Sequence, residues 1–348
     1  MTDFLFNALI LGIDALVIAL VARSKRGGMG LTGAAGGLLA ALVVATFLQE
    51  GTFHLFRLLA YLAFAHTPLV LLGVAWIVRA RTKVISGLCV SLAIVIWGVA
   101  GYAFIIEPHR LELTVVQLHS SKVSHSIRVA IVADLQTDQI GAYERRALTM
   151  VLDAEPDLIL MTGDYLHENS ALRHQLAVDL NGLFGEIEFG APMGAFATRG
   201  NTEHNDWPQL FAATRVTPFV GTATITVDEV DVTGLDLWDS FDSELHIGPS
   251  ERFHIVFGHS PDFALGTVDA DLLVAGHTHG GQIRLPILGP IVTMASVPRA
   301  WAAGVTGLAN GRTLVVSRGI GMERGKAPRL RFLCRPEVVI VDILPEGQ

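Results

Sequence analysis

The sequence contains little cysteine, little charge and no excess of basic residues. Its two cysteines, Cys89 and Cys334, provide neither a disulfide framework nor a thiolate metal site, because Cys89 lies inside an apolar segment. Internal repeats and low-complexity tracts are also missing. Of 348 residues, 25 are basic and 33 acidic, which gives a net charge of -8, and no basic stripe occurs outside two short loops. This charge pattern argues against nucleic acid as a partner.

Hydrophobic residues, by contrast, make up 51% of the chain, and the mean hydropathy is +0.48. The excess is concentrated in about the first hundred residues, and the remainder has a water-soluble composition. We therefore expect a transmembrane domain at residues 1–106, with the lipid bilayer as its partner, and a water-soluble domain at residues 107–348.

Four apolar segments in the first domain are each near the roughly 20 residues that a spanning helix needs. They are residues 4–21, 31–48, 55–78 and 84–106. The first segment lacks a basic stretch before it, and three further apolar segments follow it. We therefore interpret it as a retained helix and not as a signal peptide.

The loops between these segments predict the orientation of the domain. Six basic residues fall in the loops after the first and the third segments, namely Arg23, Lys25, Arg26, Arg79, Arg81 and Lys83. The loop between the second and third segments has only Arg57 at its edge. The positive-inside rule places the basic loops in the cytoplasm. The chain is thus expected to be a multi-pass protein of the cell (inner) membrane with its soluble domain outside the cytoplasm.

Two ionisable residues lie near the middle of apolar segments, Asp14 in the first and His66 in the third. Ionisable groups inside a membrane are candidates for a functional role such as transport. No series of further ionisable residues accompanies them, however. A pair that locks the helices together is therefore the favoured interpretation, and a transport unit is the weaker one.

In the second domain, five apolar runs typical of buried strands each end in polar side chains that can bind metal. The runs are residues 127–133, 158–161, 195–197, 254–257 and 272–275. The candidate ligands that follow them are Asp134 and Gln136, Asp164, Asn201, His259, and His277 and His279. In open α/β sheets, ligands bind beyond the carboxyl ends of the strands. We therefore expect a shared metal site at these strand ends.

His277 and His279 give the strongest local signal. Residues two apart in an extended chain point to the same side, and imidazole is the commonest metal ligand. A polar turn with two histidines is the alternative. Single-residue alternatives also exist for the other positions, because Asp134 and Asp164 can cap a helix or a turn, Asn201 can hold a left-handed turn, and His259 can be a core histidine. These alternatives do not explain why five strand ends carry metal-type ligands.

The motifs resemble those of the calcineurin-like metallophosphoesterases, over residues 111–344. The family pattern is D-x-H, G-D, G-N-H-D/E, a lone His and G-H-x-H. It reads here as Asp134-Leu135-Gln136, Gly163-Asp164, Gly200-Asn201-Thr202-Glu203, His259 and Gly276-His277-Thr278-His279. Pro286 after the last motif, the tail Ser317-Arg318-Gly319-Ile320-Gly321, Arg331 and Arg335-Pro336-Glu337-Val338 are similar to the bacterial membrane-associated branch.

The resemblance implies a four-layer α/β/β/α sandwich with two divalent metal ions, for which Mn, Fe or Zn suit the oxygen and imidazole ligands. One ion would be held by Asp134, Gln136, Asp164 and His279. The other would be held by Asp164, Asn201, His259 and His277, so that Asp164 bridges them. Such a pair shares a hydroxide that attacks phosphorus.

Two residues depart from the family pattern. Gln136 replaces a ligating histidine, and Thr202 replaces a histidine that contacts the phosphate and helps the leaving group. Glu203 keeps the acidic position beside it, and His204 lies two residues after Thr202, so the candidate catalytic residues are Asn201, Thr202, Glu203 and His204. We expect a membrane-tethered metal-dependent hydrolase of a lipid-like or lipid-linked phosphoester. The alternative is a weakened metal- and phospholigand-binding module that acts as a sensor or as a partner of another membrane protein.

Overall fold

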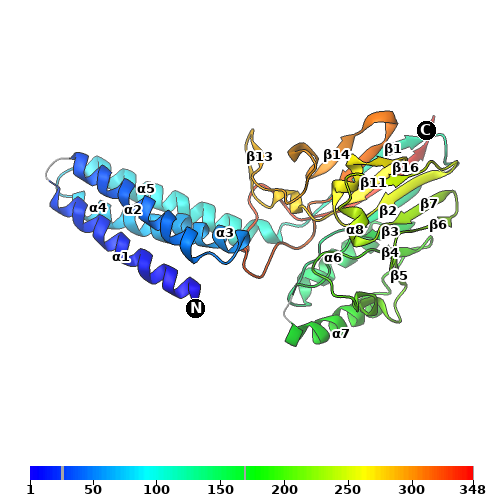
Figure 1. Cartoon of the computed structure of the whole chain (residues 1–348), viewed down its shortest axis with the longest axis horizontal. Coiled ribbons are helices and arrows are strands. Elements are labelled where there is room, and N and C mark those ends of the chain that lie inside the picture. The colour runs from blue at the N-terminus through cyan, green and yellow to red at the C-terminus, as the bar shows by residue number, and fades with distance from the viewer. Residues whose placement is uncertain (25–26, 168–169, 348) are drawn as a thin grey trace. The chain divides into compact units, whose positions relative to one another are not determined.

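The computed structural model describes residues 1–24, 27–167 and 170–347, and the chain forms two compact units (Figure 1). The first unit comprises Met1–Ile106 and Arg324–Arg329, and the second comprises Glu107–Glu323 and Leu330–Gln348. Lys25 and Arg26, two of the six basic residues that predict the membrane orientation, lie outside the described residues. A short segment from late in the sequence thus groups with the N-terminal helices.

The first unit is helical. Its elements are α1 (Thr2–Arg23), α2 (Gly27–Leu48), α3 (Thr52–Tyr61), the π-helical turn η1 (Leu62–His66), α4 (Thr67–Val78), α5 (Lys83–Gly101) and the π-helical turn η2 (Tyr102–Ile106). In the described part of the chain, three stretches are long and apolar enough to cross a membrane, namely Thr2–Arg23, Thr52–Val78 and Lys83–His109. They overlap the first, third and fourth predicted segments. The second predicted segment lies in α2, where Ala35–Leu48 is a shorter apolar helix.

Asp14 and His66 form the predicted pair inside the first unit. His66 Nδ1 lies 2.7 Å from Asp14 Oδ2, and His66 Nε2 lies 2.9 Å from Asn7 Oδ1. Both ionisable side chains are buried. The imidazole thus joins α1 to the third predicted segment, and the prediction that the two residues pair is confirmed.

The second unit contains two mixed six-stranded sheets, so the predicted α/β class is confirmed. The first sheet has the order β1 (Glu112–Ser120), β16 (Glu337–Pro345), β2 (Ile127–Val132), β3 (Leu158–Met161), β4 (Ala195–Ala197) and β5 (Val216–Pro218). The second has the order β14 (Gly304–Gly307), β15 (Thr313–Val316), β11 (Leu272–Ala275), β9 (Phe253–Phe257), β7 (Val230–Gly234) and β6 (Ala223–Val227). The five predicted runs correspond to β2, β3, β4, β9 and β11, and every residue of β3, β4, β9 and β11 is buried.

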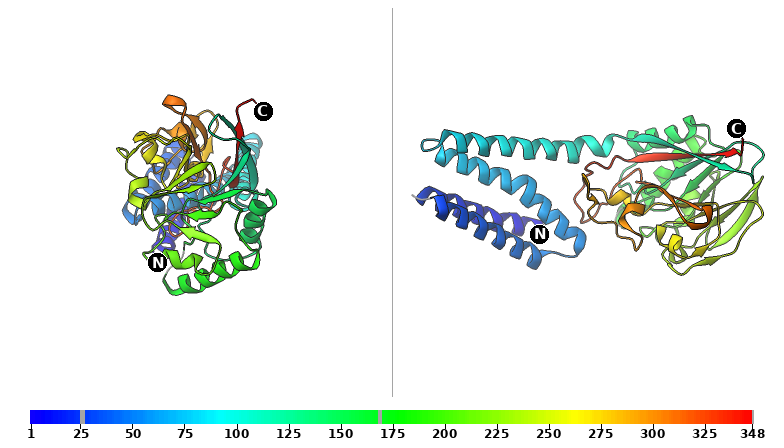
Figure 2. Two further views of the ribbon diagram at one scale, coloured as in Figure 1. Left: turned by 90° about the vertical axis from the view of Figure 1, so that its right-hand side faces the viewer. Right: turned by 90° about the horizontal axis from the view of Figure 1, so that it is seen from above.

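Strands β2 to β5 run parallel to one another, as do β7, β9, β11 and β15. Consequently, the carboxyl ends of β2, β3 and β4 share one edge of the first sheet, and those of β9 and β11 share one edge of the second. β16 pairs parallel with β1 and antiparallel with β2, and the views of Figure 2 show the C-terminal strand beside β1. The first and last strands of the unit therefore lie side by side.

Apolar side chains from both sheets form a shared core. Ile131 and Leu160 of the first sheet pack in one cluster with Phe257 and Val274 of the second. The other face of the first sheet is covered by α6 (Ala142–Asp153) and α7 (Ser170–Glu186), which belong to a second cluster. The second sheet packs on its other face against short elements such as η5 (Pro261–Leu265), and α8 (Leu237–Ser240) is also short. The four-layer form of the sandwich stays a prediction.

The remaining elements are short and belong to loops. They are η3 (Glu107–His109), η4 (Trp207–Phe211), β8 (His246–Ile247), β10 (Thr267–Val268), η6 (His279–Gly281), β12 (Arg284–Leu285), β13 (Gly289–Pro290), η7 (Arg299–Trp301) and η8 (Ala309–Gly311). Several of them follow β11 directly. The polypeptide around the ends of β9 and β11 is therefore mostly turns, which can bring polar side chains together.

Candidate metal centre

The loops after the predicted strands are held together by hydrogen bonds within and between the two sheets. Gln136 N–H donates to Asp164 O at 2.7 Å, and Gly276 N–H donates to His259 O at 3.0 Å. Between the sheets, His277 N–H donates to Asp134 Oδ1 at 3.0 Å. The strand ends of both sheets thus meet at one place, as their sequence positions predict.

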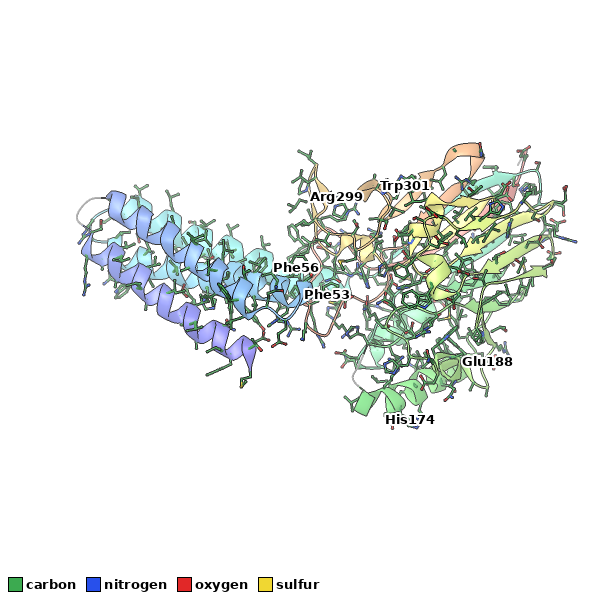
Figure 3. The ribbon with its side chains drawn as sticks, viewed as in Figure 1. Phe53, Phe56, His174, Glu188, Arg299 and Trp301 are labelled. Carbon is green, nitrogen blue, oxygen red and sulfur yellow. The ribbon has the colours of Figure 1, made fainter. Side chains whose placement is uncertain are left out.

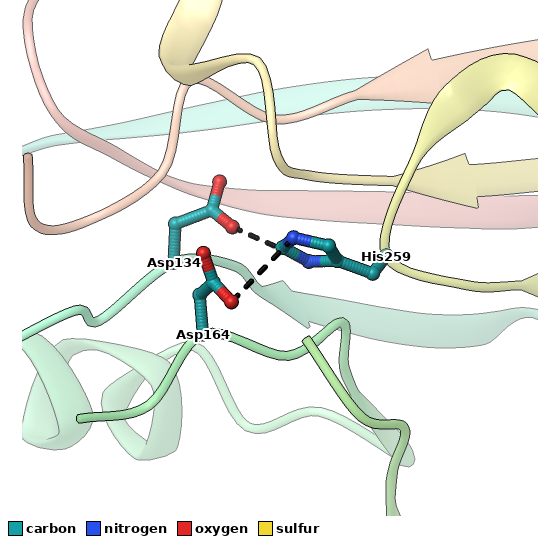
Figure 4. Close-up of side chains that lie close together, drawn as sticks. All are labelled: Asp134, Asp164 and His259. Carbon is teal, nitrogen blue, oxygen red and sulfur yellow. Dashed lines mark ion pairs between the residues drawn. The ribbon is translucent and has the colours of Figure 1, made fainter. Parts of the chain in front are cut away.

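Asp134, Asp164 and His259 lie at the centre of the region where the strand ends of the two sheets meet (Figure 4). One potential ligand atom from each lies within 4.8 Å of the others, and all three residues are buried. His259 Nδ1 is 3.8 Å from Asp134 Oδ1, and His259 Nε2 is 3.5 Å from Asp164 Oδ1. Two carboxylates and an imidazole at this spacing are a suitable donor set for a divalent cation.

The hydrogen bonds of His259 and His277 reveal an excess of acceptors. His259 Nδ1 lies 2.9 Å from Thr162 O and His277 Nε2 lies 3.1 Å from Met294 O, so each of these nitrogens must donate a proton to a carbonyl. Burial lowers the pKa of His259 to about 4, and burial together with the nearby His259 lowers that of His277 to about 4, so both are neutral at pH 7. Their other nitrogens therefore carry lone pairs, and these lone pairs face each other at 3.1 Å.

Oxygen acceptors converge on the same point. Asn201 Oδ1 lies 2.8 Å from His259 Nε2, beside Asp164 Oδ1. The buried Asp134 Oδ2, also of the predicted set, has no hydrogen-bond partner among the described residues. Burial also raises the pKa of Asp134 and of Asp164, and the neighbouring Asp164 raises that of Asp134 further. A bound cation would satisfy these lone pairs and keep the carboxylates ionised, so the residues fit a metal centre.

The backbone of the predicted ligands is strained. Asp134, Gln136, Asp164, His277 and His279 all have positive φ angles, between 35° and 68°. Such angles are uncommon for residues other than glycine and are concentrated at functional sites. The fold therefore maintains these side-chain directions at an energetic cost.

Gln136 and His279 have surroundings that the sequence did not predict. Gln136 is buried, and its Nε2 lies 3.1 Å from Glu323 Oε2 and 3.2 Å from His167 Nδ1. His279 is also buried, and its Nδ1 lies 3.5 Å from Arg331 Nη2. Burial and the Arg331 charge lower the pKa of His279 well below the usual value. No local pattern marked His167 or Glu323, because they are 31 and 187 residues from Gln136.

The four candidate catalytic residues occupy different positions around Asp164. The buried Glu203 carboxylate accepts N–H bonds from Asp164 and Tyr165 at 2.8 Å and from Gly200 at 2.9 Å. Burial and the Asp164 charge raise the pKa of Glu203 to about 7. Thr202 donates to Asp164 Oδ1 from its N–H at 2.9 Å and its hydroxyl at 3.1 Å. Asn201 and His204 are exposed.

A close approach of two loops explains the glycines of this motif. A Cβ atom on Gly163 would lie 2.4 Å from Gly200 N, and one on Gly200 would lie 2.2 Å from Asp164 N. Any side chain at either position would therefore separate the two loops. Glycine at both positions, together with the Glu203 carboxylate, keeps Asp164 next to Asn201.

A family model described as calcineurin-like phosphoesterase matches residues 127–281, a range that includes all five strand ends. The chain is 29% identical over 284 residues to the metallophosphoesterase YkuE of Bacillus subtilis, which covers 75% of this chain and 96% of YkuE. It is 28% identical over 261 residues to the phosphodiesterase YaeI of Escherichia coli, covering 70% and 92%. It is 24% identical over 320 residues to the UDP-2,3-diacylglucosamine pyrophosphatase LpxG of Chlamydia muridarum, covering 69% and 92%.

Proposed function

The chain belongs to the calcineurin-like phosphoesterase family and is a phosphoric ester hydrolase, and we propose that it hydrolyses a lipid-like or lipid-linked phosphoester with two divalent metal ions. The observation that carries the metal proposal is the pair of imidazole lone pairs of His259 and His277, which face each other with no proton between them and lie beside the oxygens of Asn201 and Asp164. We further propose that the hydrolase domain lies outside the cytoplasm and belongs to a bacterial membrane-associated branch of the family.

Each ion has a proposed set of ligands. One set is Asp134, Gln136, Asp164 and His279, and the other is Asp164, Asn201, His259 and His277. When bound, divalent cations such as Mn, Fe or Zn supply Lewis acidity, a water of lowered pKa and neutralisation of the phosphoryl oxygens. Asp164 belongs to both proposed sets, as the family resemblance implies, and its Oδ1 lies 3.5 Å from His259 Nε2.

The protein's own residues prepare this centre. Thr162 O accepts a hydrogen bond from His259, and Met294 O accepts one from His277. These bonds fix the tautomer in which the other ring nitrogen has a lone pair available for a metal ion. Thr202 donates two hydrogen bonds to Asp164 Oδ1 and so orients that carboxylate. Glu203 is held by three backbone N–H groups, which favours a positioning role for it. His204 is exposed and remains the candidate on this loop for protonating a leaving group.

Two observations support a lipid-like substrate. The relative LpxG is named for action on a diacylated sugar nucleotide, and this chain carries apolar helices that suit a membrane. Tethering a site near the bilayer raises the effective concentration of a substrate that is itself in the bilayer. We therefore favour an ester whose phosphate is carried by a lipid, and the choice between mono- and diester is left to the assay.

The test is hydrolysis by the full chain in nanodiscs, with and without added Mn²⁺, of a soluble aryl phosphodiester, an aryl phosphomonoester and phospholipids. We expect Mn²⁺-dependent turnover that Asp164→Asn lowers by about a thousandfold, since the bridging charge is lost. Asp342→Asn is the matched control, because Asp342 is a buried aspartate that pairs with Arg128 away from the centre. Absence of turnover with every metal, or stable binding of a phosphorylated ligand without its consumption, would refute the proposal.

The proposed orientation has a separate test. Val220→Cys lies at an exposed position of the second unit. It should react with a membrane-impermeant maleimide in cells whose outer envelope is opened and whose cell (inner) membrane is intact. Arg81→Cys, in a predicted cytoplasmic loop, should react only after the cell membrane is permeabilised. Both variants are made with Cys89→Ala, so that the only native cysteine left is Cys334, which is buried and therefore shielded from the reagent. The opposite labelling pattern would show that the hydrolase domain faces the cytoplasm.

A further inference from the structure

An apolar hairpin projects from the second unit directly after the metal motif. We use this name for residues 284–294, which include β12, β13 and the turn between them. The large apolar side chains of Leu285, Ile287, Leu288, Ile291 and Met294 are all exposed. No charged residue occurs from position 285 to position 298. An exposed apolar surface of this kind marks a site of interaction with a protein or a membrane.

The tip of the hairpin exposes apolar side chains although its backbone has a conformation that is unfavourable for isoleucine. Leu288 N–H donates to Pro286 O at 2.8 Å across a three-residue turn, and Ile287 in the middle has a φ of 71°. A branched side chain is disfavoured at such an angle, which suits glycine or asparagine. Ile287 is nevertheless fully exposed, and Leu288 is 70% exposed. The isoleucine thus gains no packing within the described structure that offsets this cost.

The base of the hairpin is joined to the metal centre. A Cβ atom on Gly281 would lie 2.3 Å from Pro290 Cβ, so the hairpin packs tightly on the loop of His279. Arg284 N–H donates to Phe332 O at 2.9 Å, and His277 donates to Met294 O at 3.1 Å. The position of the tip is therefore linked through a short, hydrogen-bonded path to the candidate ligands.

Basic side chains flank the uncharged stretch. Arg284 lies at its start, and the exposed Arg299 lies at its end, on the segment between β13 and β14 (Figure 3). An apolar tip with basic residues at its base is the arrangement found in elements that lie in a membrane interface, because arginine binds anionic headgroups there.

The chain itself indicates which occupant covers the tip. The last candidate span runs to His109, and β1 begins at Glu112. The sequence therefore attaches the hydrolase fold to a membrane span through only a few residues. We propose that the apolar hairpin inserts its tip into the bilayer and holds the metal centre at the level of the lipid headgroups. The choice of a lipid phosphoester as substrate rests on the proposed function, whereas the insertion itself does not.

Insertion is tested with the full chain in nanodiscs. Leu288→Cys and Val220→Cys, each made with Cys89→Ala, carry an environment-sensitive fluorophore, and the lipids carry a nitroxide on the acyl chain. Val220 is the matched control, because it is also apolar and 70% exposed but lies outside the hairpin. We expect emission from position 288 to shift to the blue and to be quenched by about threefold or more, as for a side chain among acyl chains, while position 220 is unaffected. Equal, water-like emission at both positions would overturn the proposal.

A second copy of this chain or another protein would give a different result. A disulfide between two Leu288→Cys chains, with no quenching by nitroxide lipids, would show that a second copy of the chain covers the tip. This result would overturn the proposal. Blue-shifted emission that is insensitive to the nitroxide would show that a protein surface, and not the bilayer, covers the tip, and would likewise overturn the proposal.

An activity measurement separates this inference from the proposed function. The double variant Ile287→Asp with Leu288→Asp should lower the ratio of turnover on a bilayer substrate to turnover on a soluble aryl phosphoester by about tenfold. Val220→Asp should leave this ratio unchanged, and an unchanged ratio in the double variant would count against the inference. If no variant or wild-type protein hydrolyses any phosphoester, the proposed function fails, and the fluorescence result still decides whether the hairpin inserts.

Discussion

The two sides of the candidate metal centre are built differently. On the side of His259 and His277, both imidazoles donate a hydrogen bond to a backbone carbonyl. The lone pair of His259 Nε2 faces Asn201 and Asp164, and that of His277 Nδ1 faces His259 Nε2. On the other side, His279 Nδ1 faces the guanidinium of Arg331, and Gln136 provides a neutral amide. We call these the histidine side and the glutamine side.

The fold thus prepares the two neighbouring candidate ligand sets to unequal degrees. A carbonyl partner fixes the ligating tautomer and increases its basicity, whereas a nearby guanidinium opposes the approach of a cation. We therefore propose that the histidine side binds its metal ion more tightly than the glutamine side.

Removing a ligand from the histidine side should have the largest effect. His259→Ala deletes an imidazole at the centre of the acceptor cluster, so we expect loss of the tightly bound ion and a fall in turnover of about a thousandfold. Elemental analysis and aryl phosphodiester hydrolysis are the measurements. His254→Ala is the matched control, because His254 is a buried histidine on β9, the strand that precedes His259, and its Nε2 is hydrogen-bonded to Thr233. Equal metal loss in both variants would show that general destabilisation, and not ligation, explains the result.

Glu203 should affect both sides, because its carboxylate holds the two loops that carry Asp164 and Asn201. Glu203→Gln puts an amide N–H₂ group near three backbone donors and leaves at least one of them unsatisfied. We expect the free energy of unfolding to fall by about 2–3 kcal/mol and both ions to bind more weakly. Denaturant unfolding and metal titration measure these changes. Unchanged stability would mean that the carboxylate does not position the loops.

Glu323 should affect the glutamine side alone. Glu323→Gln weakens the partner of Gln136 Nε2, so the affinity of the weaker ion should fall by about tenfold while the tighter ion is retained. Metal-competition titration measures both affinities. Glu244→Gln, at an exposed residue outside the centre, serves as the control. A loss at the histidine side would contradict the division of the centre into two sides.

Gln136→His should have the smallest effect and the opposite sign. It replaces a neutral amide by an imidazole, a better ligand for Zn, Fe and Mn, so the weaker ion should bind several-fold more tightly. The guanidinium of Arg331 remains near His279 and limits the gain. A decrease in affinity would show that the glutamine side is adapted to the amide.

The sequence predicted the parts of the molecule that depend on local patterns. Apolar runs identified β2, β3, β4, β9 and β11, and the polar residues after them meet at one place because parallel strands end at a common edge of each sheet. The pairing of Asp14 with His66 was also predicted, because an isolated buried charge needs a partner.

Contacts between distant segments could not be predicted in this way. The parallel pairing of β1 with β16 joins residues more than 200 positions apart, and no periodicity encodes it. The bonds of Gln136 to His167 and Glu323 are of the same kind. Residues 324–329 group with the N-terminal helices, where Arg57 donates to Gly325 O and Ala327 O, and no composition signal in that segment distinguishes it from a surface loop.

Titration of the metal-free full chain with Mn²⁺, followed by electron paramagnetic resonance, tests directly whether two bridged ions bind with unequal affinity. We expect two ions per chain that bind with unequal affinity and become spin-coupled when the second ion binds. His279→Ala should retain only the first, tighter ion. A single ion in the wild-type chain, or two uncoupled ions of equal affinity, would contradict a bridged centre with two unequal sides.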